Sequence, residues 1–175
     1  HQRQLARIYL LMGDAYGAQK QANKALSAYQ TVQEVDVDYL SEAIPKIVAL
    51  YQQQGMTEAL CLYLEETHAK WPRVAITHAL AEYYAEHQNP AKAILFLKSE
   101  IERQPSLKGL MQWIQFEQNQ PDLNTDNQQQ LATLQNLAHK LIQHKPVYRC
   151  HQCGFSGRIL FWQCPGCKHW GSIKP

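Results

Sequence analysis

The sequence repeats a pattern at an interval of about 34 residues, a period typical of stacked helical repeats. Three small alanines recur at this interval, and a large side chain follows each of them four positions later. These residues are Ala25, Ala59 and Ala93, followed by Tyr29, Tyr63 and Leu97. Within each segment the apolar residues are spaced by three and four, as on one face of an amphipathic helix. The period therefore predicts a mainly α chain in which pairs of helices stack as an α-solenoid.

Breaks between the apolar segments divide each unit into two helices. The first helix of each unit ends near Tyr16, Tyr51 and Tyr84, and turns are expected at 17–20, 54–55 and 88–90. The units span about 3–36, 39–72 and 74–105. A degenerate helix pair is expected at 107–144, with a polar loop over 118–130 and Thr125 or Asp126 as a cap of its second helix. The sequence predicts a solenoid over residues 1–145.

The units resemble the tetratricopeptide repeat. The first unit matches that pattern best, through Tyr9, Met12-Gly13, Tyr16, Ala25 and Tyr29. Small residues such as Gly13 and Ala25 are expected where two antiparallel helices cross closely. The resemblance covers roughly residues 5–105. The second unit departs from it by being one residue short, and the third has Ala81 where Gly is usual.

The tail of the chain differs from the rest and contains two C-x-x-C pairs. Residues 148–175 carry four basic side chains and no acid, while the whole chain has a formal charge of only +2. The four cysteines are Cys150, Cys153, Cys164 and Cys167. Two such pairs can place four sulfurs around one tetrahedral cation, and so small a module needs a staple to fold. We expect a rubredoxin-like or zinc-ribbon metal domain at 146–175, in a reducing compartment.

The spacing of the cysteines does not separate zinc from iron. Four protein sulfurs leave no open position for an activated water, so a structural role is favoured over hydrolysis. His151 and His169 lie beside the pairs, but four cysteines already complete the shell. Cys61, between two leucines, is expected to be a buried apolar residue. No nucleophile triad, phosphate loop or paired carboxylate site is evident, so the sequence does not predict an enzyme.

The combination of these repeats with this tail resembles the lipopolysaccharide assembly protein B family. The residues that carry the resemblance run from Tyr148-Arg149-Cys150 through Gly154-Phe155, and from Trp162 and Cys164-Pro165 to Trp170, Ile173 and Pro175. The resemblance implies a non-enzymatic scaffold or adaptor that regulates lipopolysaccharide (lipid A) biosynthesis. In that family, it promotes turnover of the committed-step deacetylase by the membrane-bound FtsH protease and works with other lipopolysaccharide assembly proteins.

The resemblance also implies a location. In that family an N-terminal helix absent from this sequence holds the protein at the cytoplasmic face of the bacterial inner membrane. The present chain has no apolar run of about 18 residues, so we expect it to be soluble. Two other interpretations stay open, a rubredoxin-like electron carrier and a zinc-ribbon nucleic-acid module. The nearly balanced charge argues against general nucleic-acid binding.

Two surfaces are expected to serve binding. Counting from the tyrosines that end the first helices places six residues on the concave, partner-binding face of the solenoid, namely Leu10, Asp14, Lys46, Ala49, His78 and Glu82. The aromatic residues of the tail are more apolar surface than so short a module can cover, so we expect the tail to dock on the solenoid. The docking set is Phe155, Phe161, Trp162 and Trp170, with Leu141 and its neighbours Leu134, Leu137 and Ile142 on the last helix as the receiver.

Overall fold

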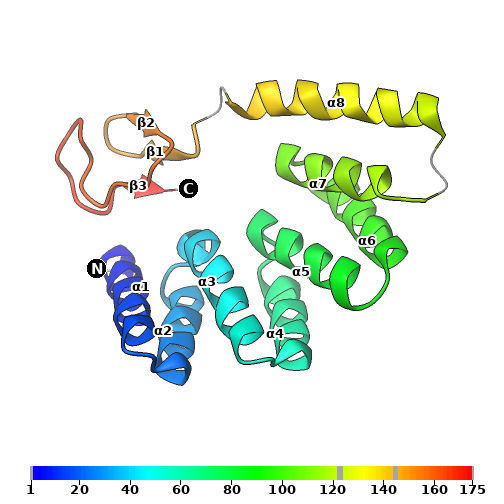
Figure 1. Ribbon diagram of the computed structural model, residues 1–175. Helices are drawn as coiled ribbons and strands as arrows, with labels where there is room; N and C mark the ends of the chain where they lie inside the picture. Colours follow the sequence, from blue (N-terminus) through cyan, green and yellow to red (C-terminus); the bar gives the residue numbers. More distant parts are fainter. Residues whose placement is uncertain (1, 122–123, 144–145, 175) are drawn as a thin grey trace. The chain divides into compact units, whose positions relative to one another are not determined.

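The structure is a computed structural model that describes residues 2–121, 124–143 and 146–174. The described part is mainly helical and ends in a small antiparallel sheet (Figure 1). The helices are α1 (Gln2–Ala18), α2 (Ala22–Val35), the short 3₁₀ helix η1 (Val37–Tyr39), α3 (Leu40–Gln53), α4 (Thr57–Lys70), α5 (Val74–His87), α6 (Pro90–Arg103), α7 (Leu107–Gln118) and α8 (Thr125–Gln143). None of these helices combines the length and the apolar composition that crossing a bilayer requires.

The helix boundaries confirm the mainly helical repeat predicted from the sequence. The second helices of the three units, α2, α4 and α6, end at Val35, Lys70 and Arg103, close to the predicted ends of their units. In the first pair, α1 and α2 lie side by side as an antiparallel hairpin (Figure 1). A Cβ at Gly13 would overlap the ring of Tyr29, and Ala25 is fully buried. The close crossing expected at these two residues is therefore present.

The last helix pair differs in detail from its prediction. Helix α8 begins at Thr125, so the polar segment before Leu131 is helical and not part of a long loop. The cap is also one residue earlier than expected, because the side chain of Asn124 accepts a hydrogen bond from the backbone N–H of Asn127 at 2.8 Å. Asn is among the best N-cap residues, and the glutamines that follow are good helix formers.

By packing, the chain divides into two compact parts, which we call the first and second packing units to distinguish them from the repeat units. The first comprises residues 1–60 together with 146–175, and the second comprises residues 61–145. Thus the ribbon packs with the first helices of the chain. Residues 144 and 145, which connect α8 to the C-terminal tail, lie outside the described residues.

Three short strands form the sheet of the tail, which we call the ribbon (residues 146–174). They are β1 (Tyr148–Cys150), β2 (Ser156–Gly157) and β3 (Ile173–Lys174), in the order β2-β1-β3. Both pairings are antiparallel, with Arg149 opposite Ser156 on one side and opposite Lys174 on the other. Cys150, Cys164 and Ile173 form a small buried core. So few apolar residues cannot hold a fold together by themselves, which points to the cysteines as its main support.

Candidate metal centre and the surface of the ribbon

The two C-x-x-C segments form two turns with the same backbone pattern. In the first, the N–H of Cys150 donates to the carbonyl of Phe155 and the N–H of Gly154 donates to the carbonyl of Cys150, at 2.7 and 3.0 Å. In the second, Cys164 and Lys168 make the equivalent bonds, to His169 and to Cys164, both at 2.9 Å. This repeated turn aims two sulfurs of each pair toward one point.

The four sulfurs meet at that point. The Sγ atoms of Cys150, Cys153, Cys164 and Cys167 all lie within 4.8 Å of one another. Two of these separations, Cys150 to Cys167 and Cys153 to Cys164, are 3.7 Å. A tetrahedral zinc site with bonds of about 2.3 Å places its sulfurs about 3.8 Å apart. The four cysteines are therefore positioned to bind one metal ion, and zinc and iron both suit four thiolates.

Backbone conformation makes room for these sulfurs. Gly154 and Lys168, the residues after each second cysteine, both have positive φ, at 77° and 61°. Gly154 meets this need at no steric cost, whereas Lys168 adopts a conformation that few side chains favour. Gly166 has a different role, because a Cβ there would lie 3.3 Å from the sulfur of Cys153. The absence of a side chain at Gly166 therefore leaves space for this sulfur.

The cysteines are not equivalent in the absence of a cation. Cys150 is buried and its sulfur lies 3.3 Å from the hydroxyl oxygen of Ser172. This contact is the main reason that the pKa of the Cys150 thiol is lowered. The pKa of Cys153 is raised: the backbone contact at Phe155 lowers it, but burial and the three neighbouring sulfurs outweigh that contact. Four thiols so close together cannot all ionise without a cation to balance them.

Other candidate ligands lie outside this cluster. His151 and His169 are exposed, and a ring nitrogen of His169 lies 3.3 Å from the carbonyl oxygen of Cys167. Cys61 belongs to the second packing unit and is half-buried, and burial, with Glu65 nearby, raises the pKa of its thiol. A raised pKa keeps a thiol protonated and poorly nucleophilic.

The ribbon packs against η1 through an aromatic stack and a buried hydrogen bond. Tyr39 is fully buried, and its ring stacks on Trp162 with centroids 5.2 Å apart and planes inclined by 25°. Its hydroxyl donates to the carbonyl oxygen of Ile173 at 2.9 Å, although the two residues are far apart in the sequence. Stacked pairs contribute about 0.5–1.5 kcal/mol beyond their burial, so this contact is a specific docking point.

Charged groups surround this stack. Lys174 at the end of β3 forms ion pairs with Asp38 and, at 3.9 Å, with Asp36. The hydroxyl of Tyr148 donates to Glu42 of α3 at 2.5 Å. Burial, followed by this hydrogen bond to a carboxylate, raises the pKa of Tyr148. The basic ribbon is thus joined to acidic side chains around η1 and the start of α3, in line with the uneven charge in the sequence.

Arg7 of α1 lies against both tryptophans of the ribbon. Its guanidinium carbon is 5.5 Å from the ring centroid of Trp162 and 5.1 Å from that of Trp170. Both distances fall within the range of cation–π attraction. Within the described residues, the buried Nε of Arg7 has no hydrogen-bond partner. Arg7 therefore contributes to docking through the faces of the two indoles.

That the last helix receives the ribbon stays a prediction, because α8 and the ribbon belong to different packing units. Trp162 and Trp170 contact α1 and η1, whereas Phe155 and Phe161 pack edge to face within the ribbon, with centroids 6.1 Å apart. On α8 the side chains Leu134, Leu137 and Leu141 are 52%, 53% and 57% exposed. Within its own packing unit, the ribbon meets a hydroxyl donor, carboxylates and a guanidinium.

Four of the six residues predicted to face a partner belong to the first packing unit (1–60 with 146–175). Leu10 is buried, and Asp14 accepts hydrogen bonds from Tyr29, at 2.6 Å, and from Lys46. Burial would raise the pKa of Asp14, but these bonds and the charge of Lys46 lower it. Leu10, Asp14 and Lys46 line a cavity whose other wall is the ribbon. Ala49 is exposed on α3 and does not line it.

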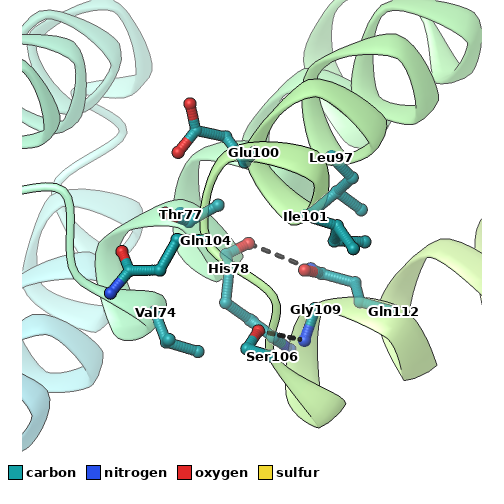
Figure 2. A pocket seen from close by; sticks show the side chains of 10 residues that line it. All are labelled: Val74, Thr77, His78, Leu97, Glu100, Ile101, Gln104, Ser106, Gly109 and Gln112. Carbon is teal, nitrogen blue, oxygen red and sulfur yellow. Dashed lines mark hydrogen bonds between the residues drawn. The ribbon is translucent and has the colours of Figure 1, made fainter.

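The other two predicted residues, His78 and Glu82, belong to α5 in the second packing unit. Their side chains form an ion pair when His78 is protonated, with Nδ1 and Oε1 3.5 Å apart. Figure 2 shows the small pocket beside His78, where Gln112 donates to the backbone carbonyl of His78 at 3.0 Å and Ser106 accepts from the N–H of Gly109. Its volume is about 20 Å³, which suits a single water molecule. This pocket cannot hold a partner's side chain.

Sequence reasoning missed the helical side of the docking surface. Tyr39, Arg7, Glu42 and Asp38 occupy no position that the repeat pattern marks. A signal was present in the charge: the acidic Asp36-Val37-Asp38 segment lies at a repeat junction, and the ribbon has no acid at all. Charge alone does not say which of several acidic segments the ribbon meets.

Comparisons with known proteins agree with this combination of repeats and ribbon. Residues 148–175 match the rubredoxin metal binding domain family. Lipopolysaccharide assembly protein B of Escherichia coli (strain K12) is 25% identical over 170 residues, 97% of this chain and 43% of that protein. The protein of the same name from Haemophilus influenzae is 24% identical over 169 residues, 97% of this chain and 42% of its own length.

The chain spans less than half the length of these relatives. Their similarity extends over the helical repeats as well as the ribbon, since it covers 97% of the chain. The four-cysteine centre lies within the segment that matches the rubredoxin metal binding domain family. A repeat array that carries such a centre at its end, with similarity along nearly its whole length, makes this chain a homologue of the proteins named lipopolysaccharide assembly protein B.

Proposed function

We propose that this chain is the protein-binding part of a non-enzymatic adaptor that regulates lipopolysaccharide biosynthesis. The relatives are named for assembly of lipopolysaccharide. A metal held by four cysteines has a complete shell and serves structure in most proteins. Helical repeats present extended surfaces to other proteins. These three arguments favour a scaffold whose metal supports a binding surface.

The finer mechanism follows from the family resemblance. The adaptor promotes turnover of the deacetylase that commits precursors to lipid A, and the membrane-bound FtsH protease carries out that turnover. A segment outside this sequence holds the whole protein at the cytoplasmic face of the inner membrane. Leu10, Asp14, Lys46, Ala49, His78 and Glu82 remain the proposed partner-binding residues.

The observation that carries the proposal is the packing of the ribbon against α1 and η1. Tyr39 donates a buried hydrogen bond to Ile173. Arg7 contacts the two tryptophans of the ribbon. The metal centre therefore supports a surface to which α1, α3 and the ribbon all contribute. A partner that reads this composite surface requires the metal, even though the metal performs no chemistry.

The test is a pull-down from Gram-negative cells with the metal-loaded chain and with a chain cut before Pro146. We expect the intact chain to recover the deacetylase and the protease, and the shortened chain to recover neither. Depletion of the full-length protein should lengthen the half-life of the deacetylase, measured after synthesis is stopped. Recovery of neither enzyme by the intact chain, together with an unchanged half-life, would contradict the proposal.

An electron carrier is the second candidate, because the sulfur-bearing side chain of Cys153 is exposed. An exposed ligand would give an electron a short path to a partner. Such a protein should be red as purified and show a reversible one-electron potential, whereas a zinc scaffold should be colourless. A nucleic-acid module would instead bind with an affinity that falls steeply with salt.

A further inference from the structure

A cavity of about 430 Å³ lies within the first packing unit, between two helices and the ribbon. Helix α1 contributes Leu10, Leu11 and Asp14, and α3 contributes Glu42 and Lys46. The ribbon contributes Tyr148 and residues from the segment 158–162. We call this cavity the ribbon groove. Its volume is in the range that accommodates a few amino-acid side chains.

The walls of the ribbon groove present aliphatic side chains from two directions. Leu11 of α1 is 51% exposed and Ile159 of the ribbon is 68% exposed, while Leu10 behind them is buried. Leu160 and Trp162 complete the apolar lining. A single exposed leucine is ordinary on a protein surface, but two aliphatic side chains that line one concavity can bury a third between them.

The groove is lined by two acids, Asp14 and Glu42, and two bases, Lys46 and Arg158, but the two acids are not paired alike. The ammonium of Lys46 is bound to Asp14, which also accepts from Tyr29. Lys46 lies four residues after Glu42 on α3, a spacing at which the two side chains could form an ion pair. However, Lys46 pairs with Asp14 instead of Glu42. Glu42 is half-buried and accepts from the neutral hydroxyl of Tyr148. Among the described residues, no cation lies within ion-pair distance of Glu42.

We propose that the ribbon groove binds a segment of a partner protein that carries an aliphatic side chain beside a lysine or arginine. The aliphatic side chain packs between Leu11 and Ile159, and the cation pairs with Glu42. This inference rests on the proposed adaptor function and names the chemistry that its partner must supply. A partly buried carboxylate without a cation favours a positive ligand.

The lining also disfavours other ligands. A hydrocarbon chain would remove Glu42 and Asp14 from water without replacing their hydrogen bonds, which is costly. A carboxylate or phosphate would be repelled by Glu42, while Arg158 is exposed to water, where charges are screened. A peptide supplies apolar, charged and hydrogen-bonding groups together.

The experiment uses the metal-loaded chain and three short fluorescent peptides that differ at one position. Their centres are Leu-Arg-Leu, Leu-Gln-Leu and Leu-Glu-Leu, and fluorescence anisotropy measures the affinity of each. We expect the Arg peptide to bind about tenfold more tightly than the Glu peptide. Glu42→Gln keeps an acceptor for Tyr148 and should abolish this preference. Glu42→Lys should reverse it.

Two further variants separate the apolar from the charged contribution. Ile159→Ser should weaken all three peptides by a similar factor. Leu95→Ser, at a side chain 69% exposed on α6 of the second packing unit, is the matched control and should change nothing. An order of affinities that Glu42→Gln leaves unchanged would overturn the proposal. So would absence of binding, or binding of a neutral octyl detergent in the groove in place of the peptides.

The same variants distinguish this inference from the proposed function. If the intact chain recovers the deacetylase and protease but Glu42→Gln and Ile159→Ser recover them equally well, the proposed peptide binding in the ribbon groove is wrong. The proposed adaptor function would still hold. If the intact chain recovers neither enzyme but shows the peptide preference, the adaptor proposal fails while the groove chemistry holds.

Discussion

Helices α1 and α8 both carry apolar side chains that their own helix pair leaves exposed, yet they differ in their partners. Helix α1 contacts the tryptophans of the ribbon through Arg7, beside the stack of Tyr39 on Trp162. On α8, Leu134, Leu137 and Leu141 remain more than half exposed. The contacts of the ribbon within its own packing unit thus combine apolar burial with a buried hydrogen bond and opposite charges. Such polar contacts make a docking surface more specific than an apolar stripe does.

The largest expected effect tests whether the metal supports the fold of the ribbon and its packing against α1 and η1. In Cys164→Ser, the metal content should fall well below about one ion per chain, because a fully buried ligand is lost. The ribbon should become sensitive to protease, and hydrogen exchange should rise in α1 and η1 but not in α5 and α6. Cys61→Ser is the control and should retain metal and protection. Retained metal with unchanged proteolysis would disprove the four-cysteine site.

The second prediction sets the two helices against each other. Trp162→Ala removes the stack on Tyr39 and the contact with Arg7, and should reduce the free energy of unfolding of the first packing unit by about 2–4 kcal/mol. Leu141→Asp, at an exposed position of α8, should change it by less than about 0.5 kcal/mol. Chemical denaturation followed by hydrogen exchange measures both, while metal analysis checks that the metal stays bound.

The opposite ranking of these two variants would support the last helix as the receiver of the ribbon. Equal, small effects would mean that the ribbon is an independent binding unit. In that case a chain cut before Pro146 should keep the stability of α1–α3 unchanged.

A smaller effect concerns the buried hydrogen bond. Tyr39→Phe leaves the carbonyl of Ile173 without its donor in a buried site, which should cost about 1–2 kcal/mol. The ring stack remains, so the loss should be smaller than for Trp162→Ala. Tyr63→Phe makes the same amino-acid change in the second packing unit, so its effect on the free energy of unfolding is compared with that of Tyr39→Phe. If Tyr39→Phe is neutral, the aromatic contact alone holds the ribbon.

The smallest expected effect is a dependence on alkaline pH. Burial and the bond to Glu42 raise the pKa of Tyr148 above its unfolded value of 10.0. A group whose pKa is raised on folding stabilises the folded state below the unfolded pKa, and this stabilisation is lost as pH rises through the folded value. Stability of the docked ribbon should thus decline above pH 10, and less steeply in Tyr148→Phe. Parallel declines in the two proteins would mean that Tyr148 does not contribute.

The local structure of this chain can be predicted from its amino-acid sequence. The regular repeat interval predicts the helix pairs, Gly13 and Ala25 mark a close crossing, and two C-x-x-C pairs identify the ligands. Each of these depends on residues that are near in sequence or on a strict covalent requirement, so periodicity and spacing reveal them. The early start of α8 was missed because glutamines and asparagines suit both loops and helices.

The docking contacts of the ribbon and the groove beside them could not be predicted from the sequence. Those contacts join residues more than a hundred positions apart, such as Tyr39 with Ile173 and Glu42 with Tyr148. Such pairs leave no period in the sequence, and any exposed apolar helix is an equally good receiver by composition. The choice depends on whether hydroxyl, carboxylate and guanidinium groups reach their partners at once, and this is set by three-dimensional geometry.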